Sequence, residues 1–136
     1  MQQLMQENAS YIIMALIIAW LLWKRLIAPK LSGVKSISAT DYQQLCKTSH
    51  VLLDVRQSGE WAKAHPAPAI HMPLSEISQR MQELDKQTPI VVICASGNRS
   101  AMAATKLANT GFDTVYNFSG GMGAWQAAGL TVKSGT

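Results

Sequence analysis

Residues 89–100 read Pro-Ile-Val-Val-Ile-Cys-Ala-Ser-Gly-Asn-Arg-Ser, and this stretch decides the fold class. Ile90–Ile93 is a short apolar run, typical of a strand that is buried on both faces. Cys94 ends the run, and the Ala-rich segment 100–109 that follows the loop predicts a helix, stopped by Gly111. A buried strand that leads through a short loop into a helix is the repeating unit of parallel α/β sheets.

The flanking segments repeat this alternation of strands and helices. Residues 51–55 are a compact apolar run of the buried-strand type, and residues 114–118 are predicted as a third strand. The predicted helices are 41–47 capped by Thr40, an amphipathic segment after Ser75 with Ile77, Met81 and Leu84 on one face, and 122–128 closed by Gly129. We therefore expect an α/β domain whose parallel sheet is covered by helices on both faces.

An apolar run near the start of the chain predicts a membrane anchor. Residues 11–23 (YIIMALIIAWLLW) would form a helix of about 20 Å, whereas a bilayer core is about 30 Å thick. A helix over 9–28 reaches about 30 Å if Lys24 and Arg25 extend to the headgroups. The alternatives are a buried helix and a signal peptide, which would carry its positive charge before the apolar run and a small-residue cleavage site after it. A retained helix, spanning or interfacial, is the reading that we favour.

The charge distribution predicts the orientation of this anchor. Lys24, Arg25, Lys30 and Lys35 follow the apolar run, and no Lys or Arg precedes it. Positive charge stays on the cytoplasmic side, so we expect a single-pass inner-membrane protein with its folded domain in the cytoplasm. The expected plan is an extracytoplasmic tail over 1–10, a transmembrane helix over 11–28, a linker over 29–38 and a domain over 39–136.

The net charge of +4 does not predict nucleic-acid binding. From Asp41 onward eight basic residues face seven acidic ones, so the folded part is nearly neutral. The basic excess lies beside the apolar run, where it favours an anionic lipid surface instead of nucleic acid.

Cys94 is the candidate nucleophile. Ligands of parallel sheets bind beyond the carboxyl ends of the strands, where Cys94 lies. Gly97 lets the loop curl with its N–H groups inward, and these donors, the start of a helix and Arg99 would stabilise a thiolate. The competing interpretation is a buried cysteine that only packs. Cys46, the other cysteine, we expect in the core, with a resolving thiol as the alternative, and the sequence has no ligand set for a metal site.

Three motifs resemble the rhodanese family. Residues 94–100, Cys-Ala-Ser-Gly-Asn-Arg-Ser, resemble its active-site loop. Residues 53–56, Leu-Asp-Val-Arg, with Glu60-Trp61 and His65, resemble its early motif, and 120–125, Gly-Gly-Met-Gly-Ala-Trp, resemble its closing motif. The likeness covers 35–132, and one such module behind an apolar helix is similar to small membrane-anchored bacterial rhodaneses.

The resemblance implies a fold, a reaction and a site. The fold would be a five-stranded parallel sheet flanked by helices. Cys94 would take sulfur from thiosulfate or a similar donor and pass it, as a persulfide, to cyanide, a thiol or a protein, with no metal or organic cofactor. The residues that would bind the sulfur are Ala95, Ser96, Gly97, Asn98, Arg99 and Ser100.

Several points stay open at this stage. Asp54, Arg56, Glu60 and His65 could act as acids and bases, but an ion-pair network that braces the loop is the interpretation that we favour. Residues 64–69, Ala-His-Pro-Ala-Pro-Ala, replace the family's glycine-containing turn, so we expect a different local shape there.

Two alternative functions remain. One is a membrane-tethered sulfur carrier or protein-binding module, with a membrane protein as a further partner. The other is a phosphatase or arsenate reductase of the same fold, whose loops have five residues between Cys and Arg. Here four residues separate Cys94 from Arg99, and the smaller ring suits one sulfur atom better than an oxyanion.

Overall fold

The computed structural model describes residues 1–27 and 33–135, and the side chains of residues 26 and 27 are not described. The chain divides into two units, Met1–Ser32 and Gly33–Thr136, which we describe separately. Part of the expected linker, residues 28–32, lies outside the described residues.

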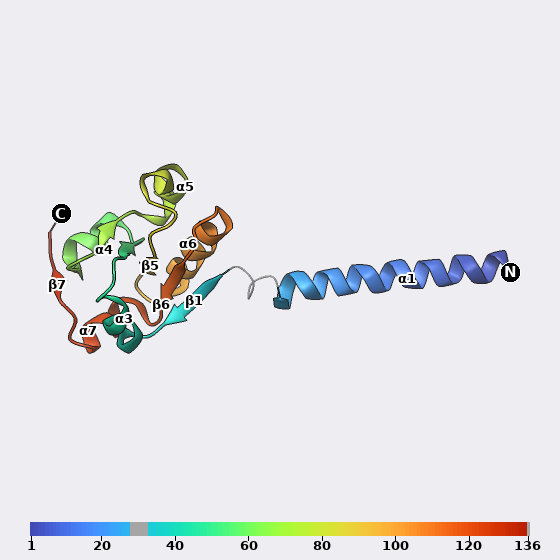
Figure 1. The fold of residues 1–136 in the computed structure, drawn as a ribbon, viewed down its shortest axis with the longest axis horizontal. Helices are drawn as coiled ribbons and strands as arrows, with labels where there is room; N and C mark the ends of the chain where they lie inside the picture. The colour runs from blue at the N-terminus through green and yellow to red at the C-terminus, as the bar shows by residue number, and fades with distance from the viewer. Residues whose placement is uncertain (28–32, 136) are drawn as a thin grey trace. The chain divides into compact units, whose positions relative to one another are not determined.

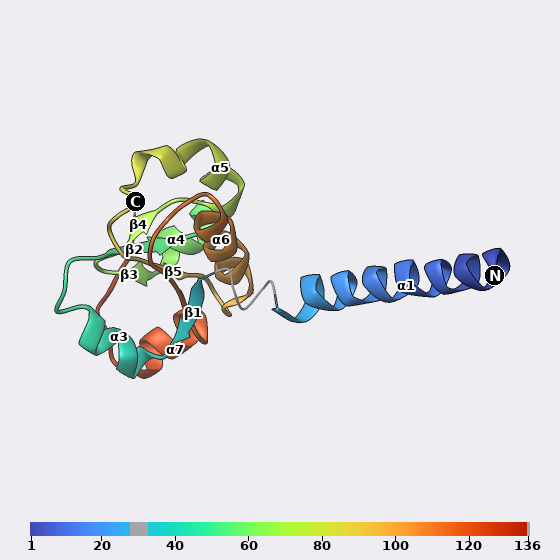
Figure 2. The same ribbon diagram turned by 45° about the vertical axis from the view of Figure 1, so that its right-hand side comes forward.

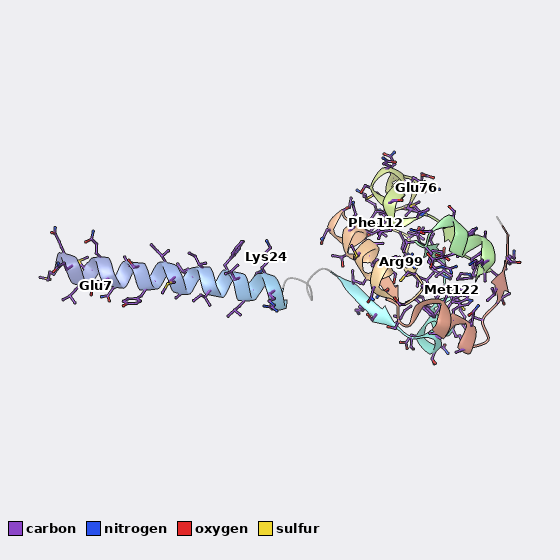
Figure 3. All side chains as sticks on the ribbon, turned by 180° about the vertical axis from the view of Figure 1, so that it is seen from behind. Glu7, Lys24, Glu76, Arg99, Phe112 and Met122 are labelled. Atoms are coloured by element: carbon purple, nitrogen blue, oxygen red, sulfur yellow. The ribbon has the colours of Figure 1, made fainter. Side chains whose placement is uncertain are left out.

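The first unit is a single long helix. Helix α1 spans Gln2–Leu22 and continues as a π-helical turn, η1, over Trp23–Ile27. Its side chains project on all sides, and none in α1 is buried (Figure 3). Within the described residues, Gln2–Arg25 is the one helix long and apolar enough to cross a membrane. It begins nine residues before the expected 11–28, so residues 2–10, which we assigned to a tail, continue the helix.

The second unit is an α/β domain (Figure 1). Its strands are β1 (Val34–Ile37), β2 (Val51–Asp54), β3 (His65–Pro66), β4 (Ile70–His71), β5 (Ile90–Ile93), β6 (Val115–Phe118) and β7 (Val132–Lys133). Its α-helices are α3 (Ala39–Leu45), α4 (Ser58–Lys63), α5 (Ile77–Arg80), α6 (Asn98–Asn109) and α7 (Gly121–Ala127), and the 3₁₀ turns η2 (Leu74–Glu76) and η3 (Met81–Glu83) flank α5.

Five strands form one parallel sheet in the order β1-β6-β5-β2-β4, which confirms the expected sheet. Strand β5 is central and is buried along its whole length. Strands β3 and β7 pair separately as a short antiparallel ladder. From β2 the chain moves to β4 on one side, and from β5 it moves to β6 on the other. The neighbours β2 and β5 therefore form a topological switch point, where α/β folds place their ligands.

Helices cover both faces of the sheet, as expected. Alternate residues of β5 point to opposite faces, so Val92 packs in the cluster beneath α5 and α6, whereas Val91 packs in the cluster beneath α3 and α7. Figure 2 shows α3 and α7 together on one side of the sheet and α5 and α6 on the other. Trp125 of α7 is the largest fully buried side chain.

The structure corrects three sequence-based boundaries. Residues 34–37, which we assigned to the linker over 29–38, form the edge strand β1 paired with β6. Ser38, not Thr40, caps α3, because its side chain accepts from the Asp41 N–H in a capping box. Helix α6 begins at Asn98, two residues before the predicted start at Ser100.

The predicted amphipathic helix after Ser75 is broken. Only Ile77–Arg80 is α-helical, the two flanking turns are 3₁₀, and Leu84 is extended. The predicted apolar face nevertheless exists, because Ile77 is fully buried and Met81 and Leu84 pack against the same core cluster.

Candidate active site

Cys94 lies immediately after β5, at the carboxyl edge of the sheet, and has no surface exposed to water. Three residues join it to α6, and the last of them, Gly97, has a φ of +104°. Only glycine adopts this left-handed conformation readily. The turn brings the Gly97 N–H to 3.0 Å from the Cys94 sulfur, as the sequence predicts for a loop curled around that sulfur.

A second polar group reaches the sulfur from α6. The Cys94 thiol donates to Ser100 Oγ over 3.3 Å, and Ser100 is itself completely buried. Burial is the largest single influence and raises the pKa of Cys94. The Ser100 hydroxyl, when it donates to the sulfur, and the N–H groups of Ser100, Gly97 and Ser96 together outweigh burial, so the pKa of Cys94 lies below its usual value.

Arg99 does not stand free beside the sulfur. Its Nη1 and Nη2 donate to the two carboxylate oxygens of Glu60 over 2.7 and 2.9 Å, a bidentate pair that ties the loop to α4. This hydrogen bonding lowers the pKa of Glu60 to about 2. Figure 3 marks Arg99 near the start of α6. Glu60, one of the four proposed bracing residues, thus contacts the loop directly.

The other three proposed bracing residues contact the segment around α4. The buried Asp54 carboxylate accepts from the Arg56 main-chain N–H and guanidinium, and Arg56 Nη2 donates to Ala64 O over 2.6 Å. His65 hydrogen-bonds through Nδ1 to Trp61 O and stacks on the Trp61 ring at 3.6 Å. Among the described hydrogen bonds, none made by these three side chains ends on residues 94–100.

Two supports of the loop come from segments that we did not predict as part of the site. A β-carbon on Gly121 would lie 2.3 Å from Ala95 O and 2.4 Å from Cys94 O, so only glycine allows this approach. The Met122 N–H, at the start of α7 (Figure 3), donates to Cys94 O over 2.9 Å. The resemblance included residues 120–125 as a motif, but it did not show this contact.

The third unpredicted support is Asn117, a buried residue of β6. Its Oδ1 lies 2.5 Å from Ser100 Oγ, and its Nδ2 donates to Gly97 O over 3.2 Å. Asn117 therefore contacts both residues whose polar groups face the sulfur. The sequence signal was an amide side chain inside the predicted strand 114–118, which reads Thr-Val-Tyr-Asn-Phe.

A cavity of about 280 Å³ opens at the β2–β5 switch point. Its walls are formed by Val55, Gln57, Pro73, Leu74, Ser75 and Arg99. Arg99 belongs both to this wall and to the loop, so the cavity is adjacent to the loop that encloses Cys94. Cys94 itself is not among the residues that line this cavity, and it has no exposed surface.

Two other predictions from the sequence concerned Cys46 and the turn over residues 64–69. Cys46 is exposed at the end of α3, so our expectation of a core position was wrong. Residues 65 and 66 of the altered turn pair with β7, and Pro66 occupies a two-stranded edge ladder.

Over residues 1–27 and 33–135, no group of three or more His, Cys, Asp or Glu side chains could hold a metal ion.

Comparisons with known proteins agree with this fold. The model of the Rhodanese-like domain family matches residues 38–128. The chain is 38% identical over 96 residues to the "Putative sulfur carrier protein YrkF" of Bacillus subtilis (strain 168), which covers 69% of this chain and 52% of that protein. The chain thus spans about half the length of this curated relative.

Solved structures share the fold. A rhodanese-related protein of Thermoplasma volcanium is 34% identical with a TM-score of 0.66, covering 73% of this chain and 97% of that chain. The thiosulfate sulfurtransferase of Pseudomonas aeruginosa is 27% identical with a TM-score of 0.65, covering 75% of this chain but 20% of that chain. With the family model extending from the cap of α3 to the end of α7, this chain belongs to the rhodanese-like domain family, which includes sulfurtransferases and sulfur carriers.

Proposed function

We propose that this chain is a sulfurtransferase that carries sulfane sulfur as a persulfide on Cys94, at the cytoplasmic face of the inner membrane. The observation that carries the proposal is the Cys94 environment, in which a buried sulfur faces the Gly97 N–H and the neighbouring N–H groups of Ser96 and Ser100 at the start of a helix. Donors in such positions stabilise negative charge on sulfur, first on the thiolate and then on the persulfide.

The reaction would proceed in two balanced displacements. In the first, the Cys94 thiolate attacks the outer sulfur of thiosulfate, a new S–S bond forms, and the old S–S bond breaks with its electron pair leaving on sulfite. In the second, cyanide or a thiolate attacks the outer sulfur of the persulfide, and Cys94 leaves as a thiolate. The covalent intermediate divides a difficult transfer into two easier steps and requires no redox partner or cofactor.

The pairing of Arg99 bears on the choice of donor. Thiosulfate is a dianion, yet the Arg99 charge at the cavity wall is already matched by Glu60. The described wall therefore gives a dianion little net attraction, and we propose that uncharged or singly charged persulfide donors are used at least as well. The pair is about one-third exposed, so water and salt screen it further.

Membrane attachment is the second part of the proposal. Residues 11–22 of α1 are apolar on every side of the helix, and Lys24 and Arg25 follow the apolar run. A chain inserted with these charges inside keeps the domain in the reducing cytosol, where Cys94 can cycle between thiol and persulfide.

A tethered sulfur carrier is the alternative that a specific observation favours. The relative from Bacillus subtilis is named as a sulfur carrier, and complete burial of Cys94 restricts its reaction with small molecules. In that case a protein, including a membrane protein, would be the acceptor, and docking would open the loop.

Intact mass measurement tests the persulfide. After exposure of the full-length chain to thiosulfate or to glutathione persulfide, we expect a gain of about 32 Da, reversed by cyanide or a thiol, as for a covalent intermediate. Cys94→Ser should abolish the gain, and the matched Cys46→Ser should keep it. An unchanged mass with both donors, in a protein whose Cys94 is reduced and can be alkylated, would contradict the proposal.

A further inference from the structure

The contacts of Asn117 fix the direction of its amide. Nδ2 lies 3.2 Å from Gly97 O, and a carbonyl oxygen can only accept a hydrogen bond, so the NH₂ end must face it. The carbonyl end, Oδ1, therefore faces Ser100 Oγ at 2.5 Å. The reversed amide would place two acceptors against each other at Gly97.

This direction decides where the Ser100 proton lies. Oδ1 has no hydrogen, so Ser100 must donate across this short contact. A hydroxyl has one proton, and Ser100 thus has only lone pairs left for Cys94, 3.3 Å away. The chain of donors runs from the Cys94 thiol to Ser100, from Ser100 to Asn117, and from Asn117 to Gly97 O.

The arrangement suits a neutral thiol better than a thiolate. A thiolate needs hydrogen-bond donors. While the Ser100 proton points to Asn117, the donors that the described residues offer to the sulfur are the Gly97 N–H and the neighbouring backbone N–H groups. For Ser100 to serve the thiolate, its proton must turn from Oδ1 to the sulfur, leaving a buried acceptor on Asn117 without its partner.

We propose that Asn117 is a positioning residue that holds the Ser100 proton away from Cys94, so that the resting site keeps a neutral thiol and forms the nucleophile only when that proton turns to the sulfur. The inference deepens the proposed function, but it concerns proton positions that exist whether or not sulfur is transferred. Its test is therefore independent of any donor or acceptor.

Charged groups near the sulfur stay the same in the test. Arg99 from α6 is paired with Glu60 from α4, and Asp54 at the end of β2 is paired with Arg56. The side chain that β6 presents to Ser100 is Asn117, which is uncharged, and α7 contributes the Met122 N–H to Cys94 O. A change at position 117 to an uncharged residue alters none of these charges.

The experiment is a thiolate titration of the full-length chain in detergent, with Cys46→Ser as the background so that one thiol remains. Thiolate formation is followed by its ultraviolet absorbance, which does not require a reagent to reach the buried sulfur. We expect Asn117→Ala to move the titration to lower pH, and alkylation at a fixed pH below the midpoint to become about tenfold faster, the size of one hydrogen bond to a charged group. Asn117→Leu, which fills the volume without an acceptor, should do the same.

A double-mutant cycle with Ser100→Ala separates positioning from bracing. In the Ser100→Ala background, Asn117→Ala should leave the titration unchanged, since there is no hydroxyl to redirect. A titration that is unmoved or moved to higher pH by Asn117→Ala, or a shift that persists without Ser100, would overturn the proposal and leave Asn117 as a brace of the loop.

A measurement on the Cys46→Ser background keeps the proposal falsifiable even if the position 117 variants fail to fold. Below the midpoint, the S–H stretching band of Cys94 should lie at the lowered frequency of a hydrogen-bond donor, and Ser100→Ala should return it towards the free value. A band at the free frequency before any change at Ser100 would contradict the inference.

Discussion

Replacing Gly121 by alanine should both destabilise the domain and slow the chemistry of Cys94. The new β-carbon would lie 2.3 Å from Ala95 O and 2.4 Å from Cys94 O. Both neighbours are backbone atoms of the active loop, so no flexible side chain can move aside. Either α7 or the loop must shift, and the Met122 N–H to Cys94 O hydrogen bond would be lost with it.

The expected cost is the sum of three effects. The left-handed conformation at Gly121, with φ of +56°, costs an alanine roughly 1–2 kcal/mol. Forced overpacking typically costs about 1–3 kcal/mol, and loss of the hydrogen bond about 1 kcal/mol. The total of roughly 3–6 kcal/mol is a large part of the 5–15 kcal/mol by which domains of this kind are stable.

Two other glycines provide matched controls. Gly129 also has a positive φ, +73°, but its β-carbon would meet nothing within 4 Å, so Gly129→Ala isolates the conformational cost. Gly123 lies within α7 with open space around it, and Gly123→Ala should gain about 0.5–1 kcal/mol from helix propensity.

The assay is urea unfolding of the full-length chain in detergent, combined with the rate of mass gain on Cys94. From most to least stable, the expected order is Gly123→Ala, wild type, Gly129→Ala and Gly121→Ala. Sulfur uptake should be slowed only in Gly121→Ala. If Gly121→Ala lost no more stability than Gly129→Ala, the inferred contact between α7 and the loop would be refuted.

Three further predictions concern charge, reaction class and topology. The pKa of Glu60 is lowered to about 2, so its pair with Arg99 stabilises the fold above pH 4.5, and this stabilisation is lost as the pH falls towards 2. Glu60→Gln should remove this part of the acid dependence of stability, which is roughly 0.2–1 kcal/mol for a pair about one-third exposed. Urea unfolding midpoints measured across this pH range would test it. A generic aryl phosphate should be hydrolysed no faster by wild type than by Cys94→Ser, whereas clear Cys94-dependent phosphate release would favour the phosphatase class. Reporters that are active on only one side of the membrane, fused to the C-terminus, should give a cytoplasmic signal, and the full-length chain should stay with the membrane in high salt. A periplasmic signal would contradict the predicted orientation, and a soluble full-length chain would contradict the predicted anchor.

The parts of the site that the sequence predicted are local. The Cys94 loop could be recognised because a strand, a glycine and a helix start follow one another within ten residues, and the geometry of each depends on near neighbours. Gly97 has the left-handed conformation, and its N–H faces the sulfur, as that local pattern indicates. Buried strands β2 and β5 were predicted for the same reason, because continuous apolar runs are decisive in parallel sheets.

The parts that the sequence did not predict depend on contacts between distant segments. Asn117 and Gly121 follow Cys94 by more than twenty residues, and they meet its loop only because β6 pairs with β5 and α7 begins at the same sheet edge. Strand β1 was assigned to a linker because an edge strand needs only half of its side chains buried, and Lys35 and Ser36 face solvent. Cys46 contradicted the general tendency of free cysteines to be buried, because it ends a short surface helix.

The size of the loop and the direction of its polar groups both indicate which chemical group Cys94 carries. A loop that binds an oxyanion must direct its N–H groups to oxygens that lie beyond the sulfur, and it must leave a space between sulfur and solvent. Here the Gly97 N–H and Ser100 Oγ lie 3.0 and 3.3 Å from the sulfur itself, and Cys94 has no exposed surface. A persulfide adds one atom, so the loop has to release the inner sulfur and let its donors face the outer one. A phosphoryl group adds a phosphorus and three further oxygens, which requires a much larger opening of a ring with only four residues between Cys94 and Arg99. The smaller rearrangement is the reason that sulfur, and not phosphate, is the cargo that we propose.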